Sequence, residues 1–271
     1  MYKMVAIDLD GTLLNDELVV SQGTIQAIQR AVGQGVVVTI ATGRMFLSAK
    51  PFAEQLGLNV PLITYQGALI KDVEEKAVMY ERLVPPHLAH DLINIAKKRN
   101  LHLQVYQDDV LYAASENDFI HEYVEAAKVP YKVEPDLAKL ASRGFQKALF
   151  IDEPEYIDEL QAELRELFSG QANFLKSKPA YLEVTHPEAD KGIALLHLAQ
   201  ELGIDRSEII GIGDSYNDFD LVTTAGLGVA MGNAVQELKD KADYISRSNN
   251  EEGVRHVIEK FILKHVAVVN D

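Results

Sequence analysis

Short apolar runs alternate with helical patterns in the first part of the chain. Val5–Ile7, Val36–Ala41 and Leu62–Tyr65 are apolar runs bounded by polar turns. Runs of this length without polar interruption are typical of strands buried on both faces of a parallel sheet. A helical spacing of apolar residues begins at Ser21, and a second helical stretch ends near Leu56. This alternation of strand and helix with short connections predicts βαβ units and a parallel sheet.

The same alternation returns in the C-terminal part of the chain. The pattern predicts a helix over Lys191–Leu202 and a strand over Ile209–Gly213, which ends at Asp214. Two further short strands are expected at Leu227–Ala230 and Asp243–Ile245, each followed by a helix. The two ends of the chain are therefore expected to share one sheet.

The middle of the chain has a different pattern. Its strand-like segments lie at 101–106, 110–112, 147–151 and 181–184. Several of them alternate apolar and polar residues, which is typical of an antiparallel sheet with one exposed face. Helices are expected between them at about 87–99, 117–127 and 155–168. Pro85-Pro86 and His186-Pro187 punctuate its ends, as linkers often do. We therefore predict an inserted α+β cap over 84–186. Residues 1–83 and 187–271 would form a Rossmann-like, three-layer α/β body.

Composition narrows the classes of protein. A chain of 271 residues fits a body with a second, smaller domain. It has 26 basic and 41 acidic residues, and its net charge of −15 repels nucleic-acid backbones and anionic lipids. Neither nucleic acid nor membrane is expected as a partner, whereas a small anionic substrate remains compatible, because a metal ion and a few cationic side chains can reverse the potential inside a cleft.

The chain has no cysteine, which excludes disulfides, thiolate metal sites and cysteine nucleophiles. This composition fits a reducing compartment. The N-terminal apolar run is broken at Asp8, and nowhere do 18 apolar residues follow one another without a charge. We therefore expect a soluble, cytoplasmic protein.

Polar clusters follow four of the predicted body elements. They are Asp8 with Asp10, Thr42 with Arg44, Lys191, and Asp214 with Asp218. The carboxyl ends of parallel strands line one crevice, so clusters far apart in sequence are expected to meet there. No phosphate-binding loop of the Gly-x-x-x-x-Gly-Lys-Ser/Thr type and no Gly-x-Ser-x-Gly elbow is present. The acidic run at 152–159 is predicted to be a solvated helix face.

Asp8 and Asp10 stand two residues apart in a turn, with Gly11 available for unusual backbone angles. Two carboxylates this close repel each other, and a divalent cation, a proton, or both relieve that repulsion. With Asp214 as a third acid, an all-oxygen set favours Mg²⁺ over zinc. Taken alone, Asp-x-Asp is short and frequent, and it also describes ordinary loop or helix-capping residues.

The other clusters suit an anion. The hydroxyl of Thr42 and the backbone N–H groups of Thr42–Arg44, which include Gly43, suit phosphate oxygens at a helix start, although an ordinary N-cap explains Thr42 equally well. Lys191 opens a helix, where a cation opposes the dipole, so it needs either a nearby anion or solvent. Asp214 and Asp218 allow one acid to bind metal while the other orients a lysine or water; the alternative is a capped helix start.

In this order the clusters resemble the motifs of the haloacid dehalogenase superfamily of phosphohydrolases. The match runs through Asp8-Leu9-Asp10-Gly11-Thr12, Thr42-Gly43-Arg44, Asp190-Lys191-Gly192 and Gly213-Asp214-Ser215-Tyr216-Asn217-Asp218. Ala230–Ala234 and Asn249–Val254 extend it to the Cof-type branch, class IIB, whose α/β cap is inserted between the second and third motifs. The resemblance covers essentially the whole chain. Gln66 departs from it, because this branch usually has asparagine there.

The resemblance implies roles for the acids. Asp8 would be the nucleophile that forms an aspartyl phosphate. Asp10 would protonate the leaving alcohol and then accept a proton from water, a role that requires a raised pKa, which burial and neighbouring acids would provide. Mg²⁺ would be held by Asp8, the backbone carbonyl of Asp10, and Asp214, with Asn217 and Asp218 in support.

The resemblance likewise implies that Thr42, Gly43 and Lys191 bind the phosphoryl oxygens, with Arg44 assisting. The expected enzyme is an Mg²⁺-dependent phosphatase of sugar phosphates or similar small phosphorylated metabolites, with the cap choosing among them. A phosphotransferase such as a phosphomutase would share the aspartyl phosphate and pass it to a sugar hydroxyl. A non-enzymatic regulator with Asp8 as phosphoacceptor ranks last, because such receivers are usually one small domain with the acidic pair before the acceptor.

Overall fold

The computed structural model describes residues 1–58 and 60–263, and its contacts divide the chain into two units. The first comprises Met1–Arg44, Ala49–Tyr80 and the described residues from Asp190 onward. The second comprises Met45–Ser48 and Glu81–Ala189. The inserted block predicted for residues 84–186 falls within the second unit.

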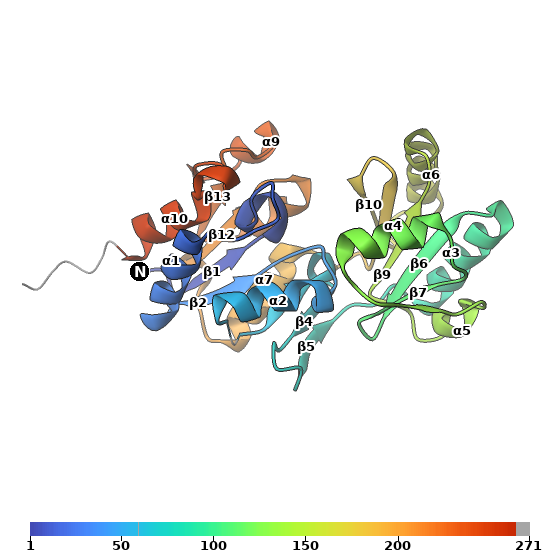
Figure 1. The fold of residues 1–271 in the computed structure, drawn as a ribbon, viewed down its shortest axis with the longest axis horizontal. Coiled ribbons are helices and arrows are strands. Elements are labelled where there is room, and N and C mark those ends of the chain that lie inside the picture. The colour runs from blue at the N-terminus through green and yellow to red at the C-terminus, as the bar shows by residue number, and fades with distance from the viewer. Residues whose placement is uncertain (59, 264–271) are drawn as a thin grey trace, which may run out of the picture. The chain divides into compact units, whose positions relative to one another are not determined.

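The first unit contains a sheet of five strands in the order β14-β13-β12-β1-β2 (Figure 1). Its strands are β1 (Met4–Ile7), β2 (Val37–Ile40), β12 (Ile209–Gly213), β13 (Leu227–Ala230) and β14 (Tyr244–Ile245). Every neighbouring pair is parallel; Met4, for example, pairs with Val37 on one side and Ile209 on the other. The predicted α/β class with a parallel sheet is confirmed, and both ends of the chain contribute to it.

Helices cover both faces of this sheet. They are α1 (Gln22–Gly33), α2 (Phe46–Leu56), α7 (Lys191–Glu201), α8 (Phe219–Thr224), α9 (Gln236–Lys239) and α10 (Gly253–Phe261). Met4 and Ala6 share a core with residues of α7 and α8, and the alternate residues Val5 and Ile7 are equally buried. Because these strands are buried on both faces, their sequences are apolar at successive positions and do not alternate with polar residues. Helices α1 and α10 pack against each other, side by side in Figure 1.

A small sheet that the hydrophobic pattern does not predict begins with β3 (Leu62–Thr64). It adds β4 (Leu69–Lys71) and β5 (Val78–Glu81) in the order β3-β4-β5, and β3 pairs antiparallel with β4. These added strands are three and four residues long, and β5 is largely exposed, so neither has a strong hydrophobic period. The tight turn Tyr65–Gly67 joins β3 to β4.

The second unit has a sheet of six strands in the order β10-β11-β9-β6-β7-β8. They are β6 (His102–Gln107), β7 (Val110–Ala113), β8 (Tyr131–Val133), β9 (Lys147–Ile151), β10 (Asn173–Lys178) and β11 (Tyr181–Thr185), with helices α3 (Pro86–Arg99), α4 (Asp118–Ala127), α5 (Ala138–Ala141) and α6 (Pro154–Leu167). All pairs are antiparallel except β7 with β8. One face packs on α3 and α6 through residues such as Leu92 and Leu160.

The other face of this sheet corrects one expectation. Its polar residues were predicted to be exposed, yet Gln104, Lys147 and Glu183 are all buried. Lys147 Nζ lies 3.1 Å from Glu183 Oε1, so the two charges compensate each other inside the unit. Tyr123 of α4 contacts the ring of Tyr181 on β11, which shows that α4 lies against this face. Polar alternation here marks a buried polar face.

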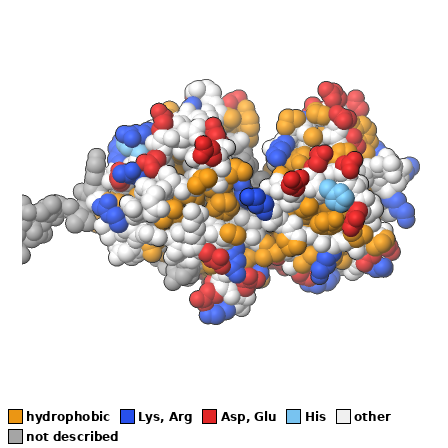
Figure 2. All heavy atoms as spheres, in the orientation of Figure 1, with side chains coloured by type: hydrophobic (Ala, Val, Ile, Leu, Met, Phe, Trp, Pro, Cys, Tyr) orange, Lys and Arg blue, Asp and Glu red, His pale blue; other side chains and the backbone are white. Residues whose placement is uncertain are grey.

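The acidic run at 152–159 was predicted to be a solvated helix face, and this is confirmed. Its acids Glu155, Asp158 and Glu159 are exposed on α6, and Figure 2 shows acidic side chains gathered there. Elsewhere on the face drawn in Figure 2, acidic and basic side chains are interspersed. Among the described residues, no helix combines the length and apolar character needed to cross a membrane.

Candidate active site

Asp8 lies directly after β1, at the carboxyl end of the parallel sheet. Its backbone N–H donates to the carbonyl oxygen of Ile212 at 2.9 Å, which continues the pairing of β1 with β12 past the last strand residue. The side chain is buried, with 4% of its surface exposed. Its Oδ1 accepts a hydrogen bond from Lys191 Nζ at 2.6 Å, across 183 residues of sequence.

Lys191 is the first residue of α7, and its ammonium group is enclosed by acids. Besides Asp8, it donates to Asp218 Oδ1 at 2.6 Å, and its side chain is completely buried. The preceding residue, Asp190, caps the helix by accepting from the backbone N–H of Ile193 at 2.8 Å. The cation at a helix start is therefore compensated by nearby anions, one of the two explanations that the sequence left open.

Asp214 and Asp218 follow β12, where the chain turns back over the sheet. Asp218 Oδ2 accepts hydrogen bonds from the backbone N–H groups of Asp214 and Ser215 at 3.0 and 3.1 Å, so it both shapes the loop and faces Lys191. Asp214 Oδ1 accepts from the hydroxyl of Thr12 at 2.9 Å. A Cβ atom on Gly11 would lie 2.5 Å from Asp214 Oδ2, so only glycine fits at this point of the first loop.

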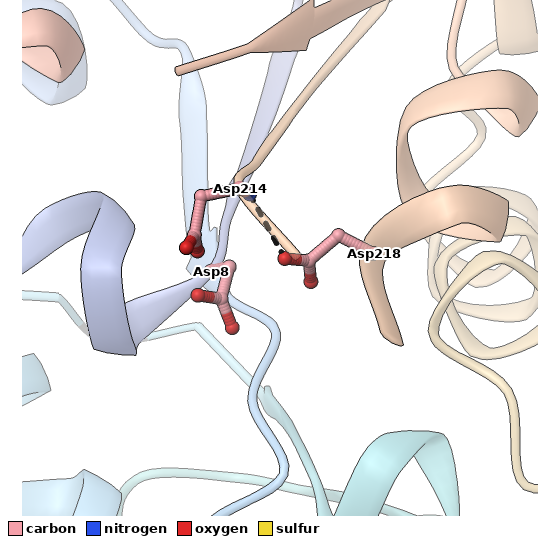
Figure 3. Close-up of side chains that lie close together, drawn as sticks. All are labelled: Asp8, Asp214 and Asp218. Atoms are coloured by element: carbon pink, nitrogen blue, oxygen red, sulfur yellow. Dashed lines mark hydrogen bonds between the residues drawn. The ribbon is translucent and has the colours of Figure 1, made fainter. Parts of the chain in front are cut away.

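The carboxylates of Asp8, Asp214 and Asp218 converge on one point (Figure 3). One oxygen of each lies within 4.8 Å of the others. With Lys191 the group carries three negative charges and one positive charge, an excess that one divalent cation would neutralise. Carboxylate oxygens are also the ligands that Mg²⁺ prefers, so the residues present fit that ion.

Burial and mutual repulsion set the protonation of this cluster. Burial, followed by the charge of Asp218, raises the pKa of Asp8 well above its usual range. The same two causes raise the pKa of Asp214 to about 6. Burial alone would lower the pKa of Lys191, but the carboxylates of Asp218 and Asp8 raise it above its ordinary value. The lysine therefore stays charged, and the acids favour a second cation.

Asp10 corrects the expectation of a buried acid. It lies in the loop Leu9–Leu13, and its side chain is 51% exposed. The guanidinium of Arg44 binds both of its oxygens, from Nε to Oδ2 at 2.7 Å and from Nη2 to Oδ1 at 2.5 Å. The carboxylate of Asp10 is therefore not one of the three that lie together, and its partner is Arg44; Gly11 follows it with a left-handed backbone (φ 77°). Asp218 takes the place in the cluster that the carboxylate of Asp10 leaves.

The turn Thr42–Arg44 follows β2 at the same end of the sheet. Thr42 is buried, and its Oγ1 accepts a hydrogen bond from the backbone N–H of Arg44 at 3.1 Å. Its hydroxyl hydrogen remains available to donate to a phosphate oxygen. The side chain of Arg44, expected to assist in phosphate binding, binds Asp10 and lies over the ring of Phe52. Helix α2 begins at Phe46, so Thr42 is not its N-cap.

Three further residues hold the loops of the site in place, a role that the sequence did not predict for them. Asn233 donates from Nδ2 to the carbonyl oxygen of Gly11 at 2.7 Å and so fixes the first loop. Thr12 holds Asp214 as described above. Gln66 accepts from Asn217 Nδ2 at 3.1 Å. Each acts through a contact with a distant segment, which no local pattern reveals.

A family model described as haloacid dehalogenase-like hydrolase matches residues 5–258 of the chain. The chain belongs to this family. The match spans the strands that carry Asp8 and Asp214, the helix that carries Lys191, and the whole second unit. The predicted resemblance is therefore confirmed at the level of the family.

Named relatives and solved structures agree with this family over nearly the full length. A 5-amino-6-(5-phospho-D-ribitylamino)uracil phosphatase of Bacillus subtilis is 32% identical over 263 residues, which cover 96% of each chain. A Thermotoga maritima crystal structure is 38% identical with a TM-score of 0.88, covering 96% of this chain and 98% of that one. A haloacid dehalogenase-like hydrolase from Bacteroides thetaiotaomicron is 30% identical with a TM-score of 0.89, covering 96% and 99%. The chain is an enzyme of this hydrolase family, whose relatives are named phosphatases.

Proposed function

We propose that this hydrolase releases phosphate from small phosphorylated metabolites, sugar phosphates or similar phosphomonoesters, through an aspartyl phosphate on Asp8. The observation that carries the proposal is the buried Asp8 carboxylate, fixed by Lys191 at 2.6 Å within a group of three acids. Such a carboxylate is oriented by one oxygen and leaves the other to react. The named phosphatase relative, whose substrate carries a phosphoribityl group, supports this substrate class.

In the first step, an Asp8 oxygen attacks phosphorus as the bond from phosphorus to the leaving oxygen breaks. Asp10 gives its proton to that oxygen, so that a neutral alcohol departs; for this step its carboxyl group must leave the ion pair with Arg44, take up a proton and turn toward the substrate. Arg44 holds the carboxylate of Asp10 by two hydrogen bonds, and once Asp10 turns to the substrate the guanidinium is available to assist in binding the phosphoryl oxygens. Thr42 and Lys191 donate hydrogen bonds to the phosphoryl oxygens.

In the second step, a water molecule attacks the phosphorus of the aspartyl phosphate and the bond to Asp8 breaks. The proton of the water passes to Asp10, which returns to its starting state. The oxygen and the other hydrogen of the water stay on phosphorus, so inorganic phosphate leaves as HPO₄²⁻, with the same charge as the ester group. Asp218 keeps Lys191 in place through both steps by its 2.6 Å hydrogen bond.

The residues that would hold Mg²⁺ are Asp8, Asp214 and the backbone carbonyl of Asp10, with Asp218 and Asn217 in support. When bound, the ion would offset the charge of the carboxylates and of the phosphoryl oxygens. Lys191 and Thr42 would stabilise the rest of the negative charge on the phosphoryl oxygens. We assign the protein to the cytoplasm, which suits a chain without cysteine.

A screen of phosphorylated metabolites with Mg²⁺, with released phosphate as the readout, tests this function. We expect phosphate release from at least one class of small phosphomonoester and none from the Asp8→Asn variant. Product analysis is part of the test, because an isomerised sugar phosphate without free phosphate would indicate a phosphomutase. If no ester is turned over and no phosphoryl group is transferred, the proposal is wrong.

We further propose that the inserted residues 84–186 choose among substrates. The acids and the lysine of the site all belong to the first unit, so the second unit is available to differ among relatives without disturbing the chemistry. Contacts to the leaving group would then contribute to turnover as well as to affinity.

An exchange of this segment tests the assignment. Residues 84–186 are replaced by the corresponding segment of a relative with a different substrate range, and the ranking of a panel of phosphomonoesters is compared. We expect the ranking to follow the inserted segment. A folded chimera that kept the original ranking would show that the first unit makes the choice.

A further inference from the structure

The turn Tyr65–Gly67 contacts three of the segments that build the site, although it carries no group used in the proposed reaction. The backbone N–H of Gln66 donates to the carbonyl oxygen of Thr42 at 3.1 Å, and that of Tyr65 donates to Arg44 at 2.9 Å. Two carbonyl oxygens of the Thr42–Arg44 turn, which is the phosphate-side turn, therefore accept hydrogen bonds from this one segment. Gly67 packs so closely on Asp190, next to Lys191, that a Cβ atom on it would lie 2.2 Å from the Asp190 carbonyl oxygen.

The side chain of Gln66 extends the same bridge to the metal side. It is buried, and its Oε1 accepts from Asn217 Nδ2 at 3.1 Å, in the loop between Asp214 and Asp218. Its Nε2 lies against Gly43, where a Cβ atom would be only 2.3 Å away. The Gln66 amide therefore lies between the Thr42–Arg44 turn and the loop that carries Asp214 and Asp218. The absence of a side chain at Gly43 leaves room for it.

The backbone of this turn is strained, which indicates that its position is held by its surroundings. Tyr65 has φ 53° and Gln66 has φ 60°, both in the left-handed region, and Gly67 follows at φ 94°. Residues with a β-carbon adopt this region rarely, and asparagine does so more readily than glutamine. Strained residues of this kind persist where neighbouring contacts over-determine them.

We infer that Gln66 is a positioning residue for the proposed phosphatase reaction, on which this inference rests. Its amide sets the distance between the Thr42–Arg44 turn and Asn217, and through Asn217 it holds the loop that carries Asp214 and Asp218. A phosphoryl group and a divalent cation bound at these two loops must be in register for in-line attack by Asp8. Glutamine is used in spite of the backbone strain because its extra methylene group gives the reach.

The test compares variants of the full-length protein. Gln66→Leu keeps the size and loses the acceptor, Gln66→Asn keeps the amide and shortens the reach, and Asn217→Ala removes the other partner. Gln66→Leu combined with Asn217→Ala completes a double-mutant cycle for the pair. Thr39→Val is the matched control, because it removes a partly buried hydrogen bond of the same unit that involves no residue of the site, from Thr39 Oγ1 to the carbonyl oxygen of Pro61 at 2.7 Å.

Two measurements are made on each variant, namely Mg²⁺ binding by calorimetry and p-nitrophenyl phosphate kinetics. We expect Gln66→Leu to weaken Mg²⁺ binding about fivefold and to lower kcat about five- to tenfold with little change in KM, as the loss of one aligned hydrogen bond predicts. Asn217→Ala should give a similar loss, and the double variant should be no worse than either single one. Thr39→Val should lower the melting temperature without changing Mg²⁺ binding.

Gln66→Asn separates positioning from a structural role. We expect it to raise the melting temperature, because asparagine tolerates the left-handed backbone, and yet to weaken Mg²⁺ binding. If Gln66→Leu and Asn217→Ala bound Mg²⁺ and turned over like the unaltered protein, or if their losses were additive, the inference would be overturned. A protein that released no phosphate would refute the proposed function, and a loss of Mg²⁺ affinity in Gln66→Leu would then show separately that Gln66 positions the cation-binding loop.

Discussion

Among the residues that the structure describes, two buried lysines form ion pairs, Lys191 in the first unit and Lys147 in the second. They differ in how their charge is balanced. Their side chains are 0% and 3% exposed. In each case burial lowers the pKa of the lysine and the neighbouring carboxylates raise it, with a net rise. Lys147 faces one acid, Glu183, and the pair is neutral. Lys191 faces Asp8 and Asp218, with Asp214 beside them, and two negative charges remain in excess.

This difference shows what makes a buried ionic cluster a site. A neutral pair needs no further charge, although Glu183 Oε2 is buried without a hydrogen-bond partner, and replacement of such a pair by apolar residues costs little. A cluster with an excess of two charges is incomplete until a cation or protons arrive, and burial, followed by the charge of Asp218, raises the pKa of Asp8 and of Asp214. Both the Lys191 cluster and the Lys147 pair are buried and ion-paired. Of the two, only the Lys191 cluster has an excess of negative charge. The strongest predictions test that distinction.

The largest effect is expected from Asp8→Asn. Because the nucleophilic oxygen is lost, turnover should fall at least about a thousandfold, with the fold unchanged. Glu183→Gln removes the same charge from the cluster of the second unit, and it should keep p-nitrophenyl phosphate turnover within about threefold of the unaltered protein. Steady-state kinetics and circular dichroism of both variants make the comparison. Near-normal turnover by Asp8→Asn would contradict the assignment of the nucleophile.

Metal removal should have the next largest effect. Exhaustive dialysis against a chelator is expected to lower turnover at least about a hundredfold, because the excess negative charge then opposes the incoming phosphate. Mg²⁺ should restore it, and Ca²⁺ should inhibit, since its larger and looser coordination misplaces the nucleophile. Mg²⁺ should also raise the melting temperature, and less so in Asp214→Asn. Full activity after dialysis into chelator would refute the metal site.

The neutral pair in the second unit predicts an effect on stability rather than on turnover. Lys147→Met leaves Glu183 buried without its partner, so the free energy of unfolding should fall by about 3 to 5 kcal/mol. Adding Glu183→Leu should recover most of that loss, as measured by urea unfolding. The corresponding pair of changes in the first unit, Lys191→Met with Asp218→Leu, should leave turnover lost whatever the stability. If the variant with both Lys191→Met and Asp218→Leu were active, the proposed difference between the two clusters would be wrong.

The smallest effect concerns Asp190, an acid next to Lys191 in sequence that faces another acid. Burial and the hydrogen bond to Asp220 raise its pKa to about 6. Because the folded pKa lies above the unfolded one, the native state binds more protons between about pH 4 and 6, and stability falls as the pH rises through that window. Asp190→Asn keeps the helix cap and removes this cost.

The expected gain in Asp190→Asn is about 1 kcal/mol at about pH 7.5, a value that allows for partial solvent exposure, and it should vanish below about pH 4. Urea unfolding of both proteins at the two pH values is the measurement. A gain that was equal at both pH values would mean that the carboxyl charge is not its cause.

The elements that sequence predicted well are those in which local pattern and final environment agree. The strand at Val5–Ile7 is apolar throughout and buried on both faces. The helix from Ser21 begins where expected, because the Ser21 hydroxyl accepts from the backbone N–H of Thr24 at 3.1 Å. The missed strands β8 and β10 are partly exposed edge strands of the second sheet. Pairing with a neighbour, rather than their own pattern, decides that they are strands.

For the site, sequence by itself determined the chemical groups and their attachment to particular strand ends. It supplied the acids at 8, 214 and 218 and the lysine at 191, and parallel strands carry such groups to one edge of a sheet. Tertiary structure decided which groups meet. It joined Lys191 to Asp8 and Asp218, paired Asp10 with Arg44, and placed Gln66 between two loops. The direction of a side chain beyond a strand depends on the backbone angles of its loop and on packing against residues distant in sequence, and neither is encoded in local spacing.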